Sequence, residues 1–471
     1  MRLIAIVCSL LWALTLQAAS VASIQQLINQ YLPDAHVGVY VQRADTGEVL
    51  INLNGRQHFT PASTTKLFTA YAALKTLGPE FTFNTNVFLD RANIHEGVYT
   101  GPVYLKFAGD PSLSSDDIAQ FVKSMKDAGI NSIHGTIFLD ISQIPAPYYA
   151  RGWVQEDLDW YFAAPISAAI IDENMMSVLL SGNPTPNQRL SARVTSNPPL
   201  PVTSYVVSAT QNESDHLCQF NSSIDQNNHV TLYGCWPVSE NPIGLKMAIV
   251  NPVKRAAQLL EMNLNNQLIA FSGEIKEGKT PADMQVLTSH LSEPLPELLV
   301  QVLRHSNNLY TETLAKQVGL AQFGRATFQA GSYAVQRIAY DTLDLPDNSL
   351  ELYDGSGLSN YNMITPQALA AVLKSFYADD VMRPILMDAL SYSGQSGTLG
   401  ARMATKDLVG RFIGKTGAMS HISNLAGYLF KTSGQSPLIV VVMINQTSVK
   451  KPELKAFEIA LMRQLMKLKI E

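Results

Sequence analysis

The chain has 471 residues, a formal net charge of −5 at pH 7 and 46% hydrophobic residues. Single hydrophobic cores stop growing at roughly 250 to 300 residues, so this length excludes one ordinary compact domain and predicts two or three. The balance of 34 Lys and Arg against 39 Asp and Glu is that of an ordinary globular protein, and it argues against a nucleic-acid partner.

The amino-terminal segment, residues 1–22, has the features of a secretory signal peptide. Arg2 supplies a positive charge, the apolar run 3–16 supplies a short core, and small residues follow it. The alternative is a buried or membrane-spanning helix, but the run is shorter than the roughly 20 apolar residues that a span requires. We therefore predict export, with a mature protein that is soluble or in peripheral contact with the membrane. Cys8 would leave with the signal.

The next elements are predicted from hydrophobic periodicity and turn residues. In chain order they are a helix over 24–31, a hairpin of strands 37–41 and 49–52, and a helix from Pro61 to Leu77. From Phe81 to Leu287 short strands alternate with Pro, Gly, Asn and Ser, which indicates a largely β insertion between two halves of one domain.

Helical periodicity returns over 295–320, and the carboxyl-terminal part alternates strands with short turns. The expected strands are 409–415, 425–430 and 438–444, followed by a helix over 452–468. Consecutive strands joined by short turns predict an antiparallel sheet with the terminal helix packed on it. The whole pattern is that of an α+β protein.

Two cysteines follow the signal, Cys218 and Cys235. A polar turn at 225–228 separates strand-like segments between them, so a hairpin would bring the two cysteines together. An oxidising compartment then favours a disulfide, with two buried thiols as the alternative.

The first candidate catalytic motif is Ser63-Thr64-Thr65-Lys66 at the start of the helix from Pro61. A serine hydroxyl needs a nearby base to act as a nucleophile, and a lysine three residues later lies on the same helix face. A neighbouring cation would lower the pKa of that lysine, and the helix amino terminus would point N–H groups at the developing oxyanion. Alone the motif is equally compatible with an ordinary helix N-cap.

Two further motifs strengthen the interpretation. Ser306-Asn307-Asn308, late in the helical stretch, offers a hydroxyl for a proton shuttle and an amide for the substrate, although a polar helix-loop corner would look the same. Lys415-Thr416-Gly417, at the end of a strand, offers two groups for a carboxylate. Gly417 would let the N–H of Ala418 complete an oxyanion hole, and the alternative is a plain strand end. The order of the three motifs predicts a serine acyl-enzyme site.

With these motifs the sequence resembles the class C penicillin-binding proteins, the penicillin-binding protein 4 group of D-alanyl-D-alanine carboxypeptidases/endopeptidases (S13 serine peptidases). Four further runs carry the resemblance: Ala108-Gly109-Asp110-Pro111-Ser112-Leu113, Ala164-Pro165-Ile166-Ser167-Ala168, Asp354-Gly355-Ser356-Gly357-Leu358-Ser359 and Ser393-Gly394-Gln395-Ser396-Gly397-Thr398-Leu399. The long interval between Lys66 and Ser306 also matches, because the family inserts two domains there.

The resemblance implies a penicillin-binding/β-lactamase-like catalytic domain, an antiparallel sheet flanked by helices, with two inserted and mainly β domains. The expected limits are 23–83 with 288–471 for the catalytic domain, 84–165 with 247–287 for the second and 166–246 for the third. It also implies peptidoglycan stem peptides as substrates and β-lactam antibiotics as covalent inhibitors.

The same resemblance assigns substrate-binding roles outside the motifs. Asp140 falls where similar proteins place an acid near the amino group of the substrate side chain, with a solvated turn residue as the alternative, and Leu358 lies in one of the shared runs. Similar proteins often carry Arg after the Ser-Gly-Leu-Ser run, where this chain has Asn360.

We therefore expect Lys66 to accept the Ser63 proton as Ser63 attacks a D-alanyl carbonyl, and the N–H groups of Ser63 and Ala418 to hold the oxyanion. Ser306 would pass a proton to the leaving amine. Asn308 would hold the acyl peptide, and Lys415 with Thr416 the terminal carboxylate.

The alternatives are a β-lactamase or esterase on the same fold and a catalytically silent cell-wall binding protein. No cofactor or metal is expected, because the histidines show no His-x-x-x-His pairing and only two cysteines follow the signal. Peripheral membrane contact and a homodimer stay open.

Overall fold

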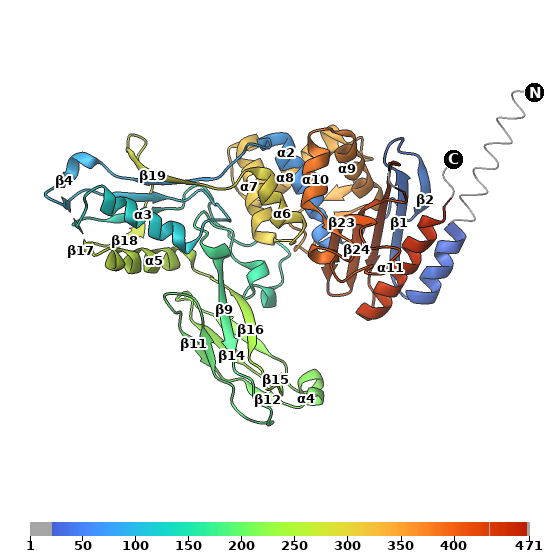
Figure 1. Ribbon diagram of the computed structural model, residues 1–471, viewed down its shortest axis with the longest axis horizontal. Coiled ribbons are helices and arrows are strands. Elements are labelled where there is room, and N and C mark those ends of the chain that lie inside the picture. The colour runs from blue at the N-terminus through green and yellow to red at the C-terminus, as the bar shows by residue number, and fades with distance from the viewer. Residues whose placement is uncertain (1–20, 433, 469–471) are drawn as a thin grey trace, which may run out of the picture. The chain divides into compact units, whose positions relative to one another are not determined.

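The computed structural model describes residues 21–432 and 434–468, so the predicted signal peptide lies outside the described residues except for its last two. The chain divides into two compact units (Figure 1). The first holds the described residues up to Glu80, the short segment Ala150–Gly152 and those from Pro294 onward. The second is made of Phe81–Tyr149 and Trp153–Glu293.

A six-stranded sheet forms the centre of the first unit, in the order β2-β1-β25-β24-β23-β22, and every neighbouring pair is antiparallel. Its strands are β1 (His36–Arg43), β2 (Val49–Leu53), β22 (Ser391–Tyr392), β23 (Phe412–Met419), β24 (Ile422–Leu429) and β25 (Leu438–Asn445). The apolar strand β25 is buried along its whole length, as expected for a strand covered on both faces. The α+β class and the antiparallel sheet are confirmed.

Helices cover both faces of this sheet. The helix over 21–31 and α11 (Lys451–Met466) share one core with it through Ile24, Ile28, Phe457 and Leu461, so the predicted packing of the terminal helix is confirmed. On the other face Gln42 of β1 donates to Ala370 O of α9 at 3.3 Å. The other helices of this unit are α2 (Lys66–Leu77), α6 (Leu295–Leu303), α7 (Asn308–Phe323), α8 (Phe328–Thr342), α9 (Pro366–Ala378) and α10 (Met382–Ala389), and α9 packs against β1, β24 and β25.

Three predicted elements in this unit have different limits in the structure. The helix expected from Pro61 begins as a 3₁₀ turn, η1 (Ala62–Thr65), before α2. The stretch 295–320 is not one helix, because Ser306 has φ +60° between α6 and α7 and therefore breaks the helical path. The strand predicted over 409–415 is β23, whose bounds lie several residues further on.

The second unit contains a five-stranded sheet in the order β18-β8-β6-β3-β19 and a four-stranded sheet in the order β17-β7-β5-β4. Their strands are β3 (Asn84–Phe88), β4 (Ile94–His95), β5 (Val98–Tyr99), β6 (Val103–Lys106), β7 (Ser132–Ile133), β8 (Ile137–Asp140), β17 (Ala270–Phe271), β18 (Ile275–Glu277) and β19 (Val286–Leu291). Two long helices, α3 (Ser115–Asp127) and α5 (Pro252–Asn266), pack against each other beside these sheets.

Neither helix was predicted, although both carry start signals in the sequence. Ser114 accepts from the N–H of Asp117 and the Asp117 side chain accepts in return, which forms a capping box. Asn251 caps α5, and Pro252 follows it at the first helical position. The surrounding turn-rich sequence concealed both signals.

Short strands around a separate apolar core form the rest of this unit. They are β9 (Met175–Leu180), β10 (Ala192–Val194), β11 (Val202–Ser204), β12 (Val207–Ala209), β13 (Asn221–Ile224), β14 (Val230–Tyr233), β15 (Cys235–Pro237) and β16 (Ile243–Ala248), with the short helix α4 (Gln211–His216). Its core is built from alternate strand residues such as Met176, Val178 and Leu180 of β9.

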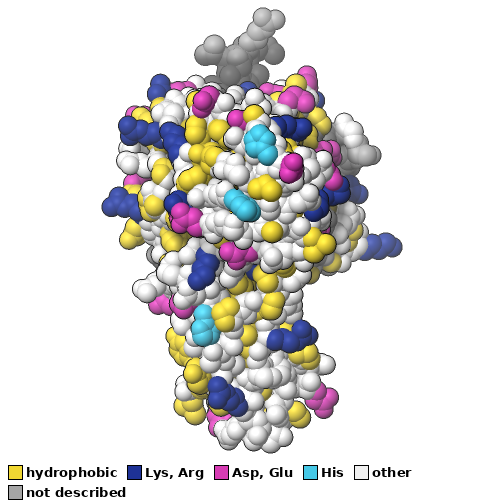
Figure 2. Space-filling model, turned by 90° about the vertical axis from the view of Figure 1, so that its left-hand side faces the viewer, with side chains coloured by type: hydrophobic (Ala, Val, Ile, Leu, Met, Phe, Trp, Pro, Cys, Tyr) yellow, Lys and Arg dark blue, Asp and Glu magenta, His cyan; other side chains and the backbone are white. Residues whose placement is uncertain are grey.

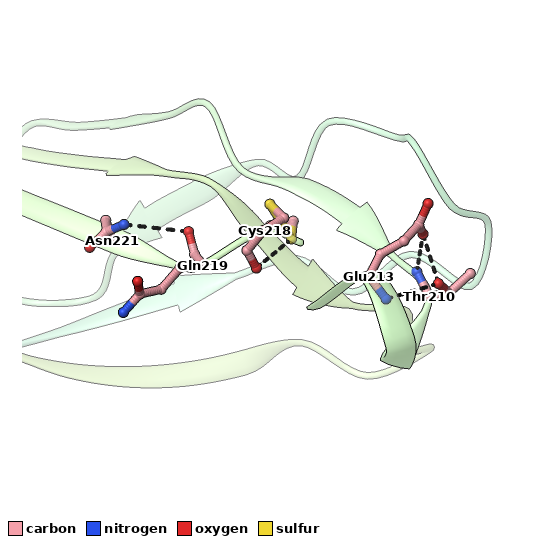
Figure 3. The surroundings of a disulfide bond; sticks show 6 residues. Thr210, Glu213, Cys218, Gln219 and Asn221 are labelled. Carbon is pink, nitrogen blue, oxygen red and sulfur yellow. Dashed lines mark hydrogen bonds between the residues drawn. A yellow bond between two sulfur atoms is a disulfide. The ribbon is translucent and has the colours of Figure 1, made fainter. Parts of the chain in front are cut away.

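A disulfide between Cys218 and Cys235 ties the end of α4 to β15, with the two Cα atoms 5.7 Å apart (Figure 3). The N–H of Cys218 also donates to Glu213 O at 3.0 Å, which continues the turn of α4. Thr210 and Glu213 cap the start of that helix reciprocally. The disulfide therefore fixes a short helix that has little apolar surface of its own to bury.

The surface carries both signs of charge. On the face shown in Figure 2, basic and acidic side chains are interspersed rather than gathered by sign. Among the residues described, no helix combines the length and the apolar character that crossing a membrane demands.

Candidate active site

Ser63 lies in η1, a turn that is braced from inside and from the sheet. Thr64 Oγ1 donates to Pro61 O at 2.8 Å and Thr65 Oγ1 donates to Ala62 O at 2.9 Å, so the turn holds its own carbonyl groups. Asn424 of β24 donates to Pro61 O at 2.9 Å, which attaches the turn to the sheet. Ser63 itself remains partly accessible, as a nucleophile must be.

Lys66 opens α2 directly behind this serine. Its side chain is fully buried, and its Nζ lies 2.9 Å from Ser63 Oγ. The same nitrogen donates to Asn308 Oδ1 at 2.6 Å and to the carbonyl oxygen of Ser356 at 2.8 Å. The expected pairing of serine and lysine is thus present in the geometry, with two further partners.

These partners decide where the lone pair of a neutral lysine points. An amide oxygen and a backbone carbonyl can only accept hydrogen bonds. In a neutral amine the two N–H groups must therefore face Asn308 and Ser356, which leaves the lone pair directed at Ser63 Oγ. The arrangement orients Lys66 to receive the serine proton.

Burial also favours the neutral form. Desolvation lowers the pKa of Lys66 to about 7, against the opposing attraction of Asp354 and Glu312. A lysine with this pKa is substantially deprotonated at neutral pH, so it has the protonation state that a general base requires.

The second motif lies in a connection and not late in a helix, which corrects the expectation. Ser306 has a positive φ in the link between α6 and α7, Asn307 is the N-cap of α7, and Asn308 is its first residue. The break brings the two motif side chains to two different lysines. Lys415 Nζ donates to Ser306 Oγ at 2.9 Å, whereas Asn308 receives its bond from Lys66.

The third motif lies in the middle of β23 and not at the end of a strand, a second correction. Lys415, Thr416 and Gly417 pair with Ala426, Leu425 and Asn424 of β24, so the ladder continues through the motif. A Cβ on Gly417 would come within 2.5 Å of Pro61 O, which shows why only glycine lets this strand approach the turn that carries Ser63. Ala418 follows it on the same strand and is exposed.

Lys415 is fully buried, and its pKa is lowered well below the ordinary value by desolvation and by the positive charges of Lys66 and Arg402. Thr416 Oγ1 donates to Thr398 Oγ1 at 2.8 Å, which adds to the site a residue whose role the sequence did not indicate. An anionic ligand beside Lys415 would reverse part of this shift, because it favours the charged form.

The loop over 354–362 supplies the backbone carbonyl that Lys66 uses. Gly357 has φ +85°, and a Cβ there would meet Ala62 O at 1.9 Å, so the loop rests directly on η1. Leu358 is half-buried and follows this glycine, and the N–H of Asn360 donates to Gly152 O at 3.1 Å. The loop holds no charged side chain at position 360.

Two buried carboxylates behind the loop, Glu312 and Asp354, were missed as site residues. Glu312 lies one helical turn after Asn308 on α7, and Asp354 begins the Asp-Gly-Ser-Gly-Leu-Ser run that carries part of the resemblance. Their signal in the sequence was an acid one helical turn after the second motif and an acid directly before a pair of nearby glycines. Both acids are fully buried, where an ionised group needs partners.

Asp140 lies at the end of β8 in the second unit, and it is only 2% exposed, so the solvated-turn alternative is wrong. Its carboxylate accepts from the N–H of Ser142 at 3.0 Å and from the N–H of Thr280 at 2.8 Å. These bonds give Asp140 a structural task in its own unit, and a contact with substrate stays a prediction.

Comparison with known proteins places this geometry in a family. The model of the D-Ala-D-Ala carboxypeptidase 3 (S13) family matches residues 17–467. The chain is 31% identical over 451 residues to the D-alanyl-D-alanine carboxypeptidase DacB of Haemophilus influenzae, covering 93% of each chain.

Solved structures give the same result. The crystal structure of penicillin binding protein 4 (dacB) from Haemophilus influenzae aligns with a TM-score of 0.88 at 30% identity, covering 94% of this chain and 99% of that one. The same protein complexed with a novel β-lactam aligns with a TM-score of 0.82 at 28% identity, over 94% and 99% of the two chains. The chain therefore belongs to the D-Ala-D-Ala carboxypeptidase 3 (S13) family.

Proposed function

We propose that this protein is a serine DD-peptidase that removes the terminal D-alanine from peptidoglycan stem peptides and also cleaves D-alanyl-diaminopimelate cross-links. The observation that carries the proposal is the position of Lys66 Nζ, which lies 2.9 Å from Ser63 Oγ and has the oxygens of Asn308 and Ser356 as its other two partners. The names of the matching relatives, D-alanyl-D-alanine carboxypeptidases, support the substrate class.

In the acylation step neutral Lys66 takes the proton from Ser63 Oγ while the oxygen forms a bond to the carbonyl carbon of the penultimate D-alanine. The carbonyl oxygen gains the negative charge, and the N–H groups of Ser63 and Ala418 would stabilise it. When the tetrahedral intermediate collapses, the carbon–nitrogen bond breaks and the amine leaves with a proton. Water then hydrolyses the acyl-enzyme: its hydroxyl joins the acyl carbon, its other proton returns to Ser63 Oγ, and the proton that Lys66 took from Ser63 replaces the one that Lys415 supplied through Ser306.

The proton for the leaving amine would come through Ser306. Its hydroxyl lies 2.9 Å from Lys415 Nζ, so a proton given to the amine by Ser306 can be replaced from Lys415. A hydroxyl that accepts from one group and donates to another suits a relay. The amide of Asn308 would hold the acyl peptide while its oxygen keeps Lys66 in place.

Lys415 and Thr416 would bind the free carboxylate of a carboxypeptidase substrate. In the unliganded site burial and neighbouring cations disfavour the charged form of Lys415, and an incoming carboxylate supplies the missing counter-charge. Substrate binding and protonation of Lys415 would therefore be coupled. The fused ring carboxylate of a β-lactam offers the same anion, which supports β-lactams as acylating inhibitors.

Purified wild-type protein and Ser63→Ala should be incubated with defined muropeptides. The proposal expects release of free D-alanine from monomeric pentapeptides and conversion of cross-linked dimers to monomers, both abolished in Ser63→Ala. Release of D-alanine without dimer cleavage would contradict the proposed endopeptidase activity. Rapid turnover of nitrocefin without either product would replace the proposal by a β-lactamase.

We propose export to the periplasm as the location, since the predicted signal 1–22 and a cell-wall substrate agree. Cell fractionation followed by amino-terminal sequencing of the mature protein tests it. Recovery of the uncleaved chain in the cytoplasm would contradict it.

A further inference from the structure

The loop over 354–362 is held in place by a carboxylate that has no part in the proposed reaction. Glu312 Oε1 accepts from the N–H of Ser356 at 2.7 Å, and both its oxygens lie 3.1 Å from the N–H of Gly355. The side chain is fully buried on α7, one turn beyond Asn308. Every one of these contacts requires an acceptor, so they suit the ionised carboxylate.

The remainder of the loop is fixed by separate bonds. Asp354 accepts from the N–H of Gly357 at 2.8 Å and from the N–H of Ser359 at 2.7 Å. Thr69, on α2 one turn after Lys66, donates to Gly355 O at 2.7 Å. Glu312 is thus the group that fixes the amide of Ser356 itself.

The two ends of Ser356 consequently have different partners. Its N–H binds Glu312, and its carbonyl oxygen accepts from Lys66 Nζ at 2.8 Å. If that carbonyl moved, one of the two acceptors that orient the lone pair of Lys66 would be lost. A shift of Glu312 would therefore change the hydrogen bonding of Lys66 Nζ through one intervening residue, Ser356.

The charges around Lys66 come from several elements. Glu312 of α7 and Asp354 of the loop attract it, and Lys415 of β23 is repelled by it. Arg402 acts in turn on Lys415, and Lys316, whose Nζ lies 3.9 Å from the ring centroid of Phe328, is attracted by Glu312. Burial, more than the neighbouring charge of Asp354, raises the pKa of Glu312 itself.

On the basis of the proposed function, we propose that Glu312 is a positioning residue for the general base: it holds the carbonyl of Ser356 against Lys66 and so directs the lysine lone pair at Ser63. It touches neither the substrate nor the reacting atoms.

Glu312→Gln separates a positioning role from a purely structural one. The variant keeps the shape of the side chain, removes its charge and places an amide NH₂ donor opposite a backbone N–H group of the loop. The measurement is the rate of acylation of the full-length mature protein by a fluorescent penicillin in rapid-mixing experiments, across pH 5 to 9, with initial binding and acylation resolved. Thr69→Val removes one loop hydrogen bond without altering charge. Tyr340→Phe is the control, since its hydroxyl holds both backbone groups of Leu350 outside the loop.

Glu312→Gln is expected to lower the acylation rate at least about tenfold while initial binding changes less than about twofold. It should also move the acid limb of the rate profile to lower pH, because the negative charge that Glu312 gains as pH rises through its own pKa of about 7 no longer raises the pKa of Lys66. Thr69→Val should lower the acylation rate without moving the limb, and Tyr340→Phe should change neither.

Three results would overturn the inference. The first is an acylation rate for Glu312→Gln within about twofold of wild type. The second is a loss that leaves the limb in place and is matched by Tyr340→Phe. If Glu312→Gln does not fold, an unchanged rate in Thr69→Val is the third. If wild-type protein is not acylated at all, the proposed function is wrong, and so is the inference that rests on it.

Discussion

Gly357 and Ala62 lie so close that a Cβ on Gly357 would come within 1.9 Å of Ala62 O and 2.7 Å of Thr65 Oγ1. Ala62 has φ +46° and directly precedes Ser63 in the chain. The contact joins the loop that supplies the Ser356 carbonyl to the turn that carries the nucleophile. This one backbone contact therefore positions two hydrogen-bonding partners of Lys66, Ser63 and Ser356.

Gly357→Ala should remove most acylation by penicillin. The new methyl group must displace either the turn or the loop, and a shift of about 1 Å in a reacting group can cost about 100-fold in rate. Strain at φ +85° adds about 1–2 kcal/mol of destabilisation. Labelling with fluorescent penicillin and thermal unfolding measure the two effects.

Gly324→Ala is the matched control, since Gly324 has φ +69° at the end of α7 but a Cβ there would have no atom within 4 Å. It carries the backbone strain alone, so the unfolding temperature should fall while labelling stays at the wild-type rate. Equal labelling of Gly357→Ala and Gly324→Ala would show that the contact with Ala62 does not matter.

Acylation should depend on pH through Lys66. Below about 7 the buried lysine is an ammonium without a lone pair, and above about 7 it is the free base. The rate should therefore rise about tenfold per pH unit below this value and level off above it. A rate that is constant from pH 5 to 8 would exclude Lys66 as the base.

The lowered pKa of Lys66 also makes the stability of the folded protein depend on pH. The unfolded chain holds this proton up to its ordinary pKa of 10.5, whereas the folded chain releases it near 7, so stability gains from this group as pH rises between the two. Lys66→Met should abolish acylation and raise the unfolding temperature at pH 6, because no buried cation remains. A lower unfolding temperature than wild type at pH 6 would contradict the argument.

Lys415→Met should remove the preference for a free carboxylate. Wild-type protein should cleave a peptide ending in D-alanyl-D-alanine roughly 10- to 100-fold better than the same peptide with a terminal amide, which is the range of a charge-assisted hydrogen bond. In Lys415→Met the two peptides should react at similar, reduced rates. Steady-state kcat/KM for both peptides gives the answer, and an unchanged ratio would assign the carboxylate to another residue.

The Cys218–Cys235 disulfide should stabilise its own part of the second unit by about 3 kcal/mol, since it closes a loop with a sequence separation of 17. Reductant should make the segment around α4 more susceptible to proteolysis in wild-type protein. The double variant Cys218→Ser/Cys235→Ser should be equally susceptible with and without reductant. Susceptibility that reductant does not change in the wild type would contradict a stabilising role.

The three candidate motifs could be recognised in the sequence because each consists of chemically distinctive residues close together in the chain. Ser63 and Lys66 are separated by one turn, and that local spacing alone brings them to 2.9 Å. The antiparallel sheet was also predictable, since strands such as 438–444 are continuous apolar runs. The pairing of Lys415 with Ser306, 109 residues apart, needed the fold.

What the sequence concealed depends on long-range packing. The break at Ser306 interrupts a helical pattern without a Pro or Gly to mark it, and β23 continues through Lys415 because β24 pairs with it. The importance of Glu312 rests on backbone N–H groups more than 40 residues further along the chain, which no local pattern reveals. The finer division of the second unit at 84–165 with 247–287 and at 166–246 stays a prediction.

The central claim is that Ser63 forms the acyl-enzyme, and mass spectrometry tests it most directly. Intact protein treated with benzylpenicillin should gain the mass of one inhibitor, and peptide mapping should place that mass on Ser63, with none on Ser63→Ala. An adduct on another residue, or no adduct on folded wild-type protein, would contradict the account.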